Sequence, residues 1–274
     1  MTVETVLDAV AGAVPTVRAT LRRERGGKTT ENPSGDVATA ADEAVDDVFA
    51  ERLGELGAVG AYASEERDGV LDCGTGFSVT VDPVDGSSNL RSNNTVGTVV
   101  GVYDGGLPAR GTALVASVVL LYGPRTTMTV ARDGETTVAP VSDGVRLDPE
   151  PVTIPDESDV LGIDGPADEW PDGASDLAVA YELRLRYTGA MVADLAHVLD
   201  RGGLAWYPTR ESRPDGVLRL QYESNPVAHV VESAGGAATD GSGRLLERDP
   251  SSLHERVPTA FGSRALVEDV EAHR

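Results

Sequence analysis

The 274-residue chain lacks several features that would indicate common classes of site. It has a single cysteine, Cys73, which excludes an internal disulfide and a zinc cluster built from cysteines. Its four histidines show no HExxH spacing, so they do not indicate a zinc hydrolase. No apolar run reaches the roughly 20 residues that a membrane helix needs. Residues 1–25 alternate apolar and charged side chains, unlike a secretion signal. We therefore expect a cytoplasmic protein without a membrane partner.

Positive charge is also scarce. Lys28 is the only lysine, and 23 Lys and Arg face 45 Asp and Glu, giving a formal net charge of −22 at pH 7. Such a surface repels nucleic-acid phosphates, so we expect no nucleic-acid partner. The acids are spread along the chain, whose aliphatic content is that of a folded protein. Because concentrated salt screens self-repulsion, we interpret this charge as halophilic adaptation and predict a salt-dependent fold.

The first part of the chain predicts two helices followed by strands. Residues 3–25 carry apolar side chains at helical spacing, with Pro15 as a kink or break. The segment from Asp36 to Asp42 leads into a second helix, whose apolar residues share one face. Further along, alternating β-type runs with a turn at Asp133-Gly134 indicate antiparallel strands. These strands are expected at residues 77–81, 96–103, 112–122, 127–131 and 136–141.

A segment rich in Pro, Asp and Glu separates the chain into two predicted units. It begins near Ser142 and contains one short strand candidate, residues 160–163. We therefore predict an N-terminal α+β metal- and phosphate-binding half, residues 1–145, and a C-terminal α/β substrate-binding half, residues 146–274. The second half should contain helices and strands that alternate along the chain. They are expected at residues 190–199 (helix), 204–207 (strand), 217–222 (strand) and 227–234 (helix).

The chemistry concentrates in the stretch that follows the strand at residues 77–81. Asp82 and Asp85 supply the hard oxygen ligands that Mg²⁺ prefers. Gly86, Ser87 and Ser88 then offer closely spaced backbone N–H groups that can receive a phosphate. An alternative reading is a surface turn with two solvated aspartates, since Asp, Pro, Gly and Ser are ordinary turn residues. The stretch by itself does not separate the two.

Other acids lie where a strand or loop gives way to another element. Converging carboxylates would repel one another strongly without cations, so convergence would imply a metal site. Oxygen ligands without cysteine or paired histidines favour Mg²⁺ or Mn²⁺ over zinc. A metal site beside a phosphate-receiving loop indicates hydrolysis of a phosphate ester by a metal-activated water. Alternatively, some of these acids only cap helices. The set comprises Asp36, Asp42, Glu65, Glu66, Asp82, Asp85 and Glu223.

These motifs resemble the magnesium-dependent, lithium-sensitive phosphatase superfamily, and within it the class I fructose-1,6-bisphosphatases. The inositol-phosphatase branch would carry a Trp-Asp-x-Ala-Ala-Gly type motif where this chain has residues 222–228. The resemblance runs from about Asp36 to Gly262 and depends on several motifs in the same order. They are Ser64-Glu65-Glu66, Asp82-Pro83-Val84-Asp85-Gly86-Ser87-Ser88-Asn89, the strand at residues 96–103, Arg186-Tyr187-Thr188-Gly189-Ala190-Met191 and Tyr222-Glu223-Ser224-Asn225-Pro226.

The resemblance implies a layered αβαβα fold with the active site between the two halves. It implies hydrolysis of the 1-phosphate of fructose 1,6-bisphosphate in gluconeogenesis with two or three Mg²⁺ ions, or Mn²⁺. Asp42 and Glu66 would be catalytic, acting on the attacking water. A homo-oligomer, dimer or tetramer, is implied because Arg186 would reach into a neighbouring subunit. The implied metal ligands are Asp36, Glu65, Asp82, the Val84 carbonyl, Asp85 and Glu223, and the implied phosphate- and substrate-binding residues are Gly86, Ser87, Ser88, Arg186, Tyr187 and Tyr207.

The chain also departs from the family pattern on the sugar-phosphate side. Val217 stands where the family places a lysine, and the family's Asn and Tyr pair falls near Ile163 and Pro166. These departures leave open another sugar or inositol phosphatase, or a non-catalytic protein that binds metal or sugar phosphate. The candidates to compensate for the missing lysine are Arg210, Arg213 and Arg219.

Overall fold

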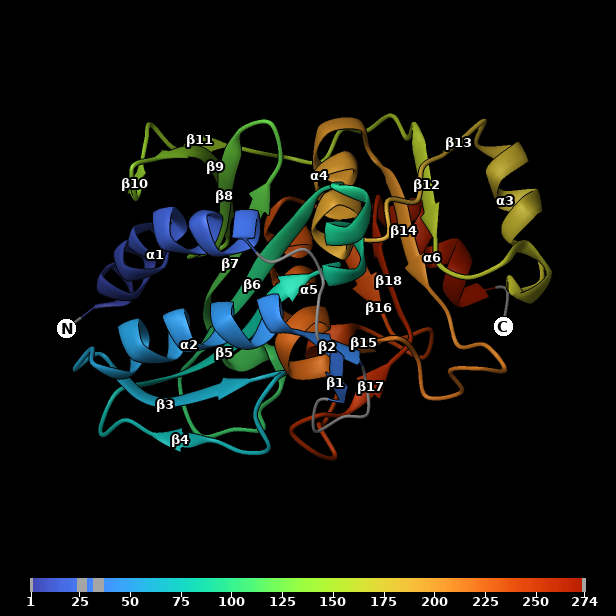
Figure 1. Ribbon diagram of the computed structural model, residues 1–274. Helices are drawn as coiled ribbons and strands as arrows, with labels where there is room; N and C mark the ends of the chain where they lie inside the picture. The colour runs from blue at the N-terminus through green and yellow to red at the C-terminus, as the bar shows by residue number, and fades with distance from the viewer. Residues whose placement is uncertain (1, 24–28, 32–36, 273–274) are drawn as a thin grey trace.

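Helices and sheets alternate through the molecule in helix, sheet, helix, sheet and helix layers (Figure 1). The computed structural model describes residues 2–23, 29–31 and 37–272, so the predicted metal ligand Asp36 lies outside the described residues. α1 (Val3–Arg23) and α2 (Ala40–Gly54) form one outer layer. α4 (Met191–Arg201) and α5 (Asn225–Ser233) lie between the sheets, and α3 (Ala174–Ala180) and α6 (Arg264–Ala272) cover the far side (Figure 1). The predicted layered α/β fold is confirmed.

The first sheet has nine strands in the order β10-β9-β8-β7-β6-β5-β3-β4, with β11 also paired to β9. β3 runs parallel to β5, and the other pairs are antiparallel, as the sequence predicts for residues 96–141. Asp133 and Gly134 have positive φ, as a tight hairpin turn requires. The strands are β3 (Val59–Ser64), β4 (Leu71–Asp72), β5 (Phe77–Asp85), β6 (Val96–Tyr103), β7 (Leu114–Tyr122), β8 (Thr126–Arg132), β9 (Glu135–Ser142), β10 (Val145–Arg146) and β11 (Glu150–Pro151).

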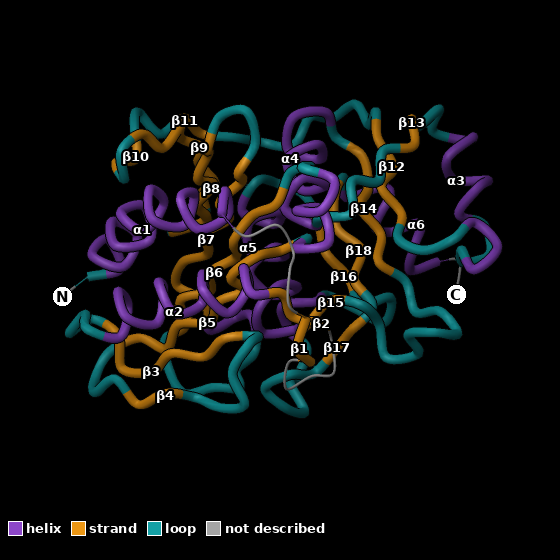
Figure 2. Tube along the Cα trace, viewed as in Figure 1, coloured by secondary structure: helices purple, strands orange, loops and turns teal. Residues whose placement is uncertain are grey.

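The second sheet has five strands in the order β13-β12-β14-β18-β16. Two short antiparallel pairs, β1 with β2 and β15 with β17, lie apart from it (Figure 2). The division into residues 1–145 and 146–274 remains a prediction, and β11 of the first sheet extends a few residues past it. The strands are β1 (Thr29–Glu31), β2 (Val37–Thr39), β12 (Val160–Ile163), β13 (Arg184–Leu185), β14 (Gly203–Tyr207), β15 (Leu218–Arg219), β16 (Ala237–Thr239), β17 (Arg256–Val257) and β18 (Thr259–Gly262).

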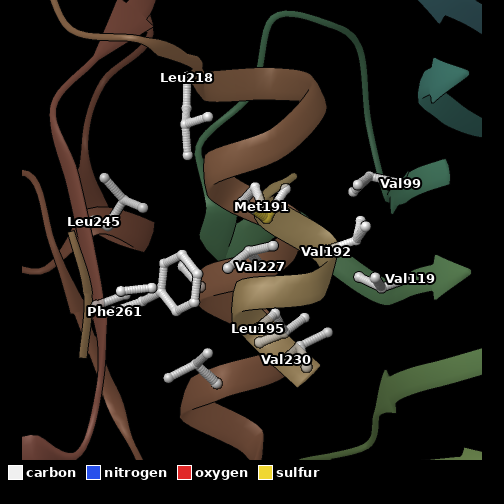
Figure 3. Close-up of a cluster of buried hydrophobic side chains, with 14 of the residues drawn as sticks. Val99, Val119, Met191, Val192, Leu195, Leu218, Val227, Val230, Leu245 and Phe261 are labelled. Carbon is white, nitrogen blue, oxygen red and sulfur yellow. The ribbon is translucent and has the colours of Figure 1, made fainter. Parts of the chain in front are cut away.

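The central helices join the two sheets through one apolar core. Figure 3 shows Met191, Val192 and Leu195 of α4 between Val99 and Val119 on one side and Phe261 on the other. A second cluster packs α1 and α2 on the opposite face of the first sheet, and a third packs α3 and α6 on the second sheet. Burial of apolar surface at about 25 cal/mol per Å² makes these interfaces the main source of stability. They fix the position of the cleft between the halves.

Two sequence-based expectations need correction. α1 runs without interruption through Pro15, so the predicted break is wrong. The strand predicted at residues 217–222 is also wrong in its second part: β15 covers only Leu218–Arg219, and a π-helical turn, Leu220–Ser224, follows. The Glu223 carboxylate accepts the Arg219 backbone N–H at 2.7 Å, which closes this turn back on the strand. Within the described residues, none of the helices combines the length and apolar character needed to cross a membrane.

Candidate active site

A β-bulge at the end of β5 brings Asp82 and Asp85 to the same side of the sheet. Side chains three residues apart on a regular strand point to opposite faces. Here Asp82 pairs with Val99 and Asp85 with Gly97, so three steps on β5 match two on β6. The bulge lies between Asp82 and Asp85 and includes Pro83, which has no N–H to donate to the neighbouring strand. The Asp-Pro-Val-Asp sequence therefore places both carboxylates, each at most 6% exposed, in one cleft.

Parallel pairing of β3 with β5 adds the upstream acids. Ser64 pairs with Val81, and the Glu65 N–H donates to the Val81 carbonyl at 3.1 Å. Because parallel strands end at the same edge of a sheet, Glu65 and Glu66 emerge beside Asp82. Both line the same cleft as Asp82.

Asp42 enters the cleft from the first turn of α2. Its Oδ2 accepts the Thr39 backbone N–H at 2.5 Å, while the Thr39 hydroxyl caps the helix in a capping box. Burial raises the pKa of Asp42, whereas hydrogen bonds from Thr39 and Ser87 act in the opposite direction. Asp42 therefore caps its helix, as one reading predicted, and also lines the cleft.

Glu223 arrives from the π-helical turn that precedes α5. Oxygens of Asp82, Asp85 and Glu223 lie within 4.8 Å of one another, and all three residues are buried. Burial, followed by the charges of Glu65 and Glu223, raises the pKa of Asp82 well above its ordinary value. Burial likewise raises the pKa of Asp85 to about 7 and of Glu223 to about 8. Three buried carboxylates so close repel one another unless protons or a cation neutralise them, and their oxygen atoms suit Mg²⁺.

Arg219 is the buried cation that accompanies these acids. Its Nη1 lies 2.6 Å from Glu65 Oε1 and 3.9 Å from Glu223 Oε2, and its side chain is only 3% exposed. The Arg219 charge lowers the pKa of Glu223 against the larger effect of burial. Arg219 is thus part of the acid cluster, and not a substitute for the family lysine at Val217.

Gly86, Ser87 and Ser88 follow the acids directly and line the same cleft. Gly86 has φ of 74°, and a side chain there would approach the Ala190 Cβ to 2.4 Å, so only glycine fits. The Val192 N–H donates to Asp85 Oδ2 at 2.9 Å, which ties the first turn of α4 to the acid strand. These contacts hold the Gly-Ser-Ser turn and its N–H groups beside the carboxylates.

Tyr187 and Tyr207 also line the cleft. The Tyr187 hydroxyl donates to Asp164 Oδ1 at 2.5 Å, and the Tyr207 hydroxyl donates to Asp194 Oδ2 at 2.6 Å. Burial raises the pKa of both tyrosines, so both stay protonated. Their rings meet edge to face, with centroids 6.4 Å apart. The two tyrosines therefore present aromatic surface to the cleft, and their hydroxyl protons are already donated to carboxylates.

The structure brings most of the predicted site residues together. Arg186 is an exception, because it is exposed and does not line this cleft, although its neighbour Tyr187 does. The sequence reasoning missed Arg256 and Asp164. No local sequence pattern indicates that either residue lies at or near the cleft. The predicted residues that line the cleft are Asp42, Glu65, Glu66, Asp82, Val84, Asp85, Gly86, Ser87, Ser88, Tyr187, Tyr207 and Glu223.

Both halves of the chain match models of one protein family. Residues 2–140 match "Fructose-1-6-bisphosphatase, N-terminal domain", and residues 154–274 match "Fructose-1-6-bisphosphatase, C-terminal domain". The two matches leave residues 141–153 between them, which includes the predicted boundary at residue 145.

Named relatives cover nearly the full length of the chain. A Natronomonas pharaonis protein named "Fructose-1,6-bisphosphatase class 1" is 45% identical, with 98% of each chain covered. A Halobacterium salinarum protein of the same name is also 45% identical, covering 98% of this chain and 96% of the relative. Among solved structures, the holo form of Leishmania major fructose-1,6-bisphosphatase superposes with a TM-score of 0.89 at 27% identity, covering 97% of this chain and 92% of that one.

Proposed function

The chain belongs to the class 1 fructose-1,6-bisphosphatase family, and we propose that it hydrolyses the 1-phosphate of fructose 1,6-bisphosphate to fructose 6-phosphate and phosphate in gluconeogenesis. The observation that carries the proposal is the meeting of Asp82, Asp85 and Glu223 beside the Gly-Ser-Ser turn. This supports a cation site and a phosphate site in one cleft. The enzyme is thus a phosphoric monoester hydrolase.

The acid cluster fits Mg²⁺ on the chemistry of its donors, which are buried carboxylates whose oxygens lie within 4.8 Å of one another. Asp82, Asp85 and Glu223 would hold an ion directly, with Glu65 and the Val84 carbonyl close by. Two or three Mg²⁺ ions, or Mn²⁺, are the proposed cofactors, and Asp36 is retained as a proposed further ligand. When bound, the ions neutralise charge on the phosphate and favour deprotonation of the attacking water.

Asp42 and Glu66 are the proposed acceptors of the proton that the attacking water loses. Asp42 is suited to this role because burial raises the pKa of its carboxyl, which makes it a stronger base than a solvated aspartate. Its capping contact with Thr39 holds the carboxylate in place. The water oxygen attacks phosphorus, the bond from phosphorus to the sugar O1 breaks, and the sugar oxygen takes up a proton.

Gly86, Ser87 and Ser88 would hold the phosphate while this exchange takes place. Their backbone N–H groups are donors aimed at an anion, and donors fixed before the reaction cost no reorganisation when charge develops. The close packing of Gly86 on Ala190 supplies that fixation. The turn therefore positions the phosphorus between the acids and the sugar.

Arg186 is proposed to bind the distal phosphate of a neighbouring subunit, together with Tyr187 and Tyr207 of that subunit's own cleft. Support comes from its surroundings, since Leu185 on the edge strand β13 is 60% exposed and Tyr187, just after that strand, is 48% exposed. Exposed apolar side chains on an unpaired edge favour association with another chain. A homo-oligomer, dimer or tetramer, would bring the guanidinium into reach, where its planar donors suit a phosphate.

The test is release of phosphate with Mg²⁺ in concentrated KCl from fructose 1,6-bisphosphate, sedoheptulose 1,7-bisphosphate and inositol 1-phosphate. We expect the highest kcat/KM for fructose 1,6-bisphosphate. Inositol 1-phosphate as the best substrate would contradict the proposed function. Sedimentation of the active enzyme tests the oligomer, and an active monomer would remove the role proposed for Arg186.

A further inference from the structure

Acids and arginines reach the cleft from different elements. The carboxylates come from β5 and the segments that join it, whereas Arg210 and Arg213 come from the loop before β15 and Arg256 comes from β17. Of the 22 arginines in the chain, four line this cleft: Arg219 beside the acids, and Arg210, Arg213 and Arg256. Such a division suits a ligand that carries one anion at a metal site and a second anion away from it.

The tyrosines cannot supply the binding of that second anion on their own. A tyrosine hydroxyl has one proton, and here Tyr187 gives its proton to Asp164 and Tyr207 gives its proton to Asp194. Each would have to leave a buried carboxylate before it could donate to a phosphate. Leaving a buried acceptor unpaired costs more than a single neutral hydrogen bond returns. The two tyrosines can therefore contact the second phosphate only together with donors from other residues.

Arg210 is placed next to Tyr187 through the same carboxylate. Its Nη1 lies 2.8 Å from Asp164 Oδ2, while Tyr187 holds the other oxygen. Gly165 leaves room for this guanidinium, because a side chain there would approach Arg210 Nη1 to 2.8 Å. A guanidinium has five N–H donors, and one carboxylate oxygen cannot occupy them all. Asp164 thus orients Arg210 and leaves donors for an anion.

Arg213 and Arg256 add two more guanidinium groups to the lining of the cleft. Arg210 and Arg213 exchange backbone hydrogen bonds of 3.2 and 2.9 Å, which fixes the short turn that carries both side chains. Arg256 comes from β17 and donates from Nη1 to the Val217 carbonyl at 2.6 Å. A guanidinium therefore lies against the backbone of Val217, whose own side chain carries no charge.

We propose that Arg210 and Arg213, with Arg256 beside them, bind the second phosphate of the substrate and determine the preference of this enzyme for a bisphosphate. The inference rests on the proposed function and names residues that replace the missing lysine. In molar salt the Debye length is about 3 Å, so only contact ion pairs retain their strength. Forked guanidinium contacts in a partly buried cleft meet that condition better than a distant field.

The test compares Arg210→Met, Arg213→Met and the double variant with the unmodified enzyme in molar KCl with Mg²⁺. We expect kcat/KM for fructose 1,6-bisphosphate to fall about ten- to a hundredfold in each single variant, the size of one lost charge-assisted contact, mainly through KM. Hydrolysis of fructose 1-phosphate, which lacks the second phosphate, should change less than about threefold by the same reasoning. Arg210→Lys should recover part of the loss.

Arg125→Met is the matched control, because it removes the same charge from an exposed position outside the cleft. It should leave both substrates unaffected. Equal losses on the bisphosphate and the monophosphate in Arg210→Met and Arg213→Met would overturn the inference, and so would unchanged KM in the double variant. If the unmodified enzyme itself shows no preference for the bisphosphate, the proposed function fails first. Circular dichroism of each folded variant separates loss of binding from loss of fold.

Discussion

Arg219 and Glu65 form a buried ion pair within the acid cluster, with 2.6 Å between Nη1 and Oε1 and side chains 3% and 13% exposed. The same guanidinium lies 3.9 Å from Glu223, so one internal cation faces several carboxylates. A buried pair compensates the cost of desolvation only when its charges are matched. Here the acids outnumber the arginine, which leaves charge for Mg²⁺ to neutralise. Arg219 and bound Mg²⁺ would therefore both neutralise the negative charge of these carboxylates.

Replacing Arg219 with methionine should destabilise the protein most when Mg²⁺ is absent. Removing one partner of a buried pair costs about 3–5 kcal/mol, and the remaining carboxylates then repel one another without compensation. We expect Tm of Arg219→Met to fall in EDTA and to rise on addition of Mg²⁺ by more than in the unmodified protein. The measurement is thermal unfolding in molar KCl with EDTA or with Mg²⁺.

Arg248→Met is the control for this comparison. Arg248 pairs with Asp240 and Glu255, outside the acid cluster, and its side chain is 33% exposed. Its loss should lower Tm equally with and without Mg²⁺. An equal response of the Arg219 and Arg248 variants would show that Arg219 has no special relation to the metal site.

Asp82→Asn should separate metal binding from stability. Asp82 is buried among acids, so removal of its charge relieves repulsion when no metal is bound. Its Oδ1 accepts the Val84 N–H at 3.1 Å, and an asparagine oxygen can keep that contact. We therefore expect Tm in EDTA to stay the same or rise, the Mg²⁺-induced increase in Tm to shrink, and kcat to fall at least about a hundredfold. A full Mg²⁺ response in the variant would exclude Asp82 as a ligand.

Asp42→Asn should abolish turnover but leave Mg²⁺ binding largely intact. The asparagine can still accept the Thr39 N–H, so the helix cap survives and stability should change by less than about 1 kcal/mol. It cannot accept a proton from water, so we expect kcat to fall about a hundred- to ten-thousandfold. Calorimetric titration with Mg²⁺ and steady-state rates provide the two readouts. Glu43→Gln, exposed at the next position, is the control, and an Asp42 variant that keeps its rate would refute the assignment.

The acid cluster was predictable from the sequence because each acid lies at the end of a strand or the start of a helix. Asp82 and Asp85 were assigned from their motif, yet the motif does not reveal the bulge that turns both to one side. Parallel pairing of β3 with β5, which sets Glu65 beside Asp82, depends on contacts between distant parts of the chain. The residue types of the acid cluster could therefore be predicted from the sequence, whereas the strand pairing and the bulge that bring them together could not.

The arginines that line the cleft were less predictable from the sequence. Arg256 reaches the Val217 carbonyl across 39 residues, and no local pattern connects the two. The strand predicted at residues 217–222 was shortened because the Glu223 side chain bonds the Arg219 backbone and closes a π-helical turn. The periodicity of apolar residues indicates which side chains are buried. It does not predict where a polar side chain accepts a backbone hydrogen bond and so ends a strand. α6 went unpredicted although its buried residues follow helical spacing.

The fold should depend on salt concentration. A formal charge of −22 on 274 residues produces self-repulsion that dilute buffer screens poorly, since the Debye length is about 30 Å at 0.01 M and about 3 Å at 1 M. We expect Tm to rise markedly between dilute buffer and molar KCl. The haloarchaeal relatives at 45% identity agree with this expectation. The same Tm in both solutions would count decisively against a salt-dependent fold.

His229 should make the folded state sensitive to mild acid. It lies on α5, its Nδ1 is 2.9 Å from the Ser117 hydroxyl of β7, and burial lowers its pKa to about 4. The ordinary pKa of histidine is about 6.5, so between these two values the unfolded chain binds a proton that the folded chain refuses. Stability therefore falls as pH drops from about 6.5 to about 4, by about 3 kcal/mol for this one group.

Removing the titrating ring should remove that part of the pH dependence. In His229→Gln, which keeps a polar group near Ser117, denaturant unfolding in molar KCl should show a smaller loss of stability from pH 6.5 to pH 4 than the unmodified protein. Ser117→Ala is the control, because it deletes the hydrogen bond but leaves the buried imidazole, so it should lower stability by about 1 kcal/mol while keeping the steep pH dependence. Since acids elsewhere titrate equally in all three proteins, the difference in slope isolates His229. If stability depends on pH with the same slope in the unmodified and His229→Gln proteins, the pKa of His229 is not lowered in the folded state.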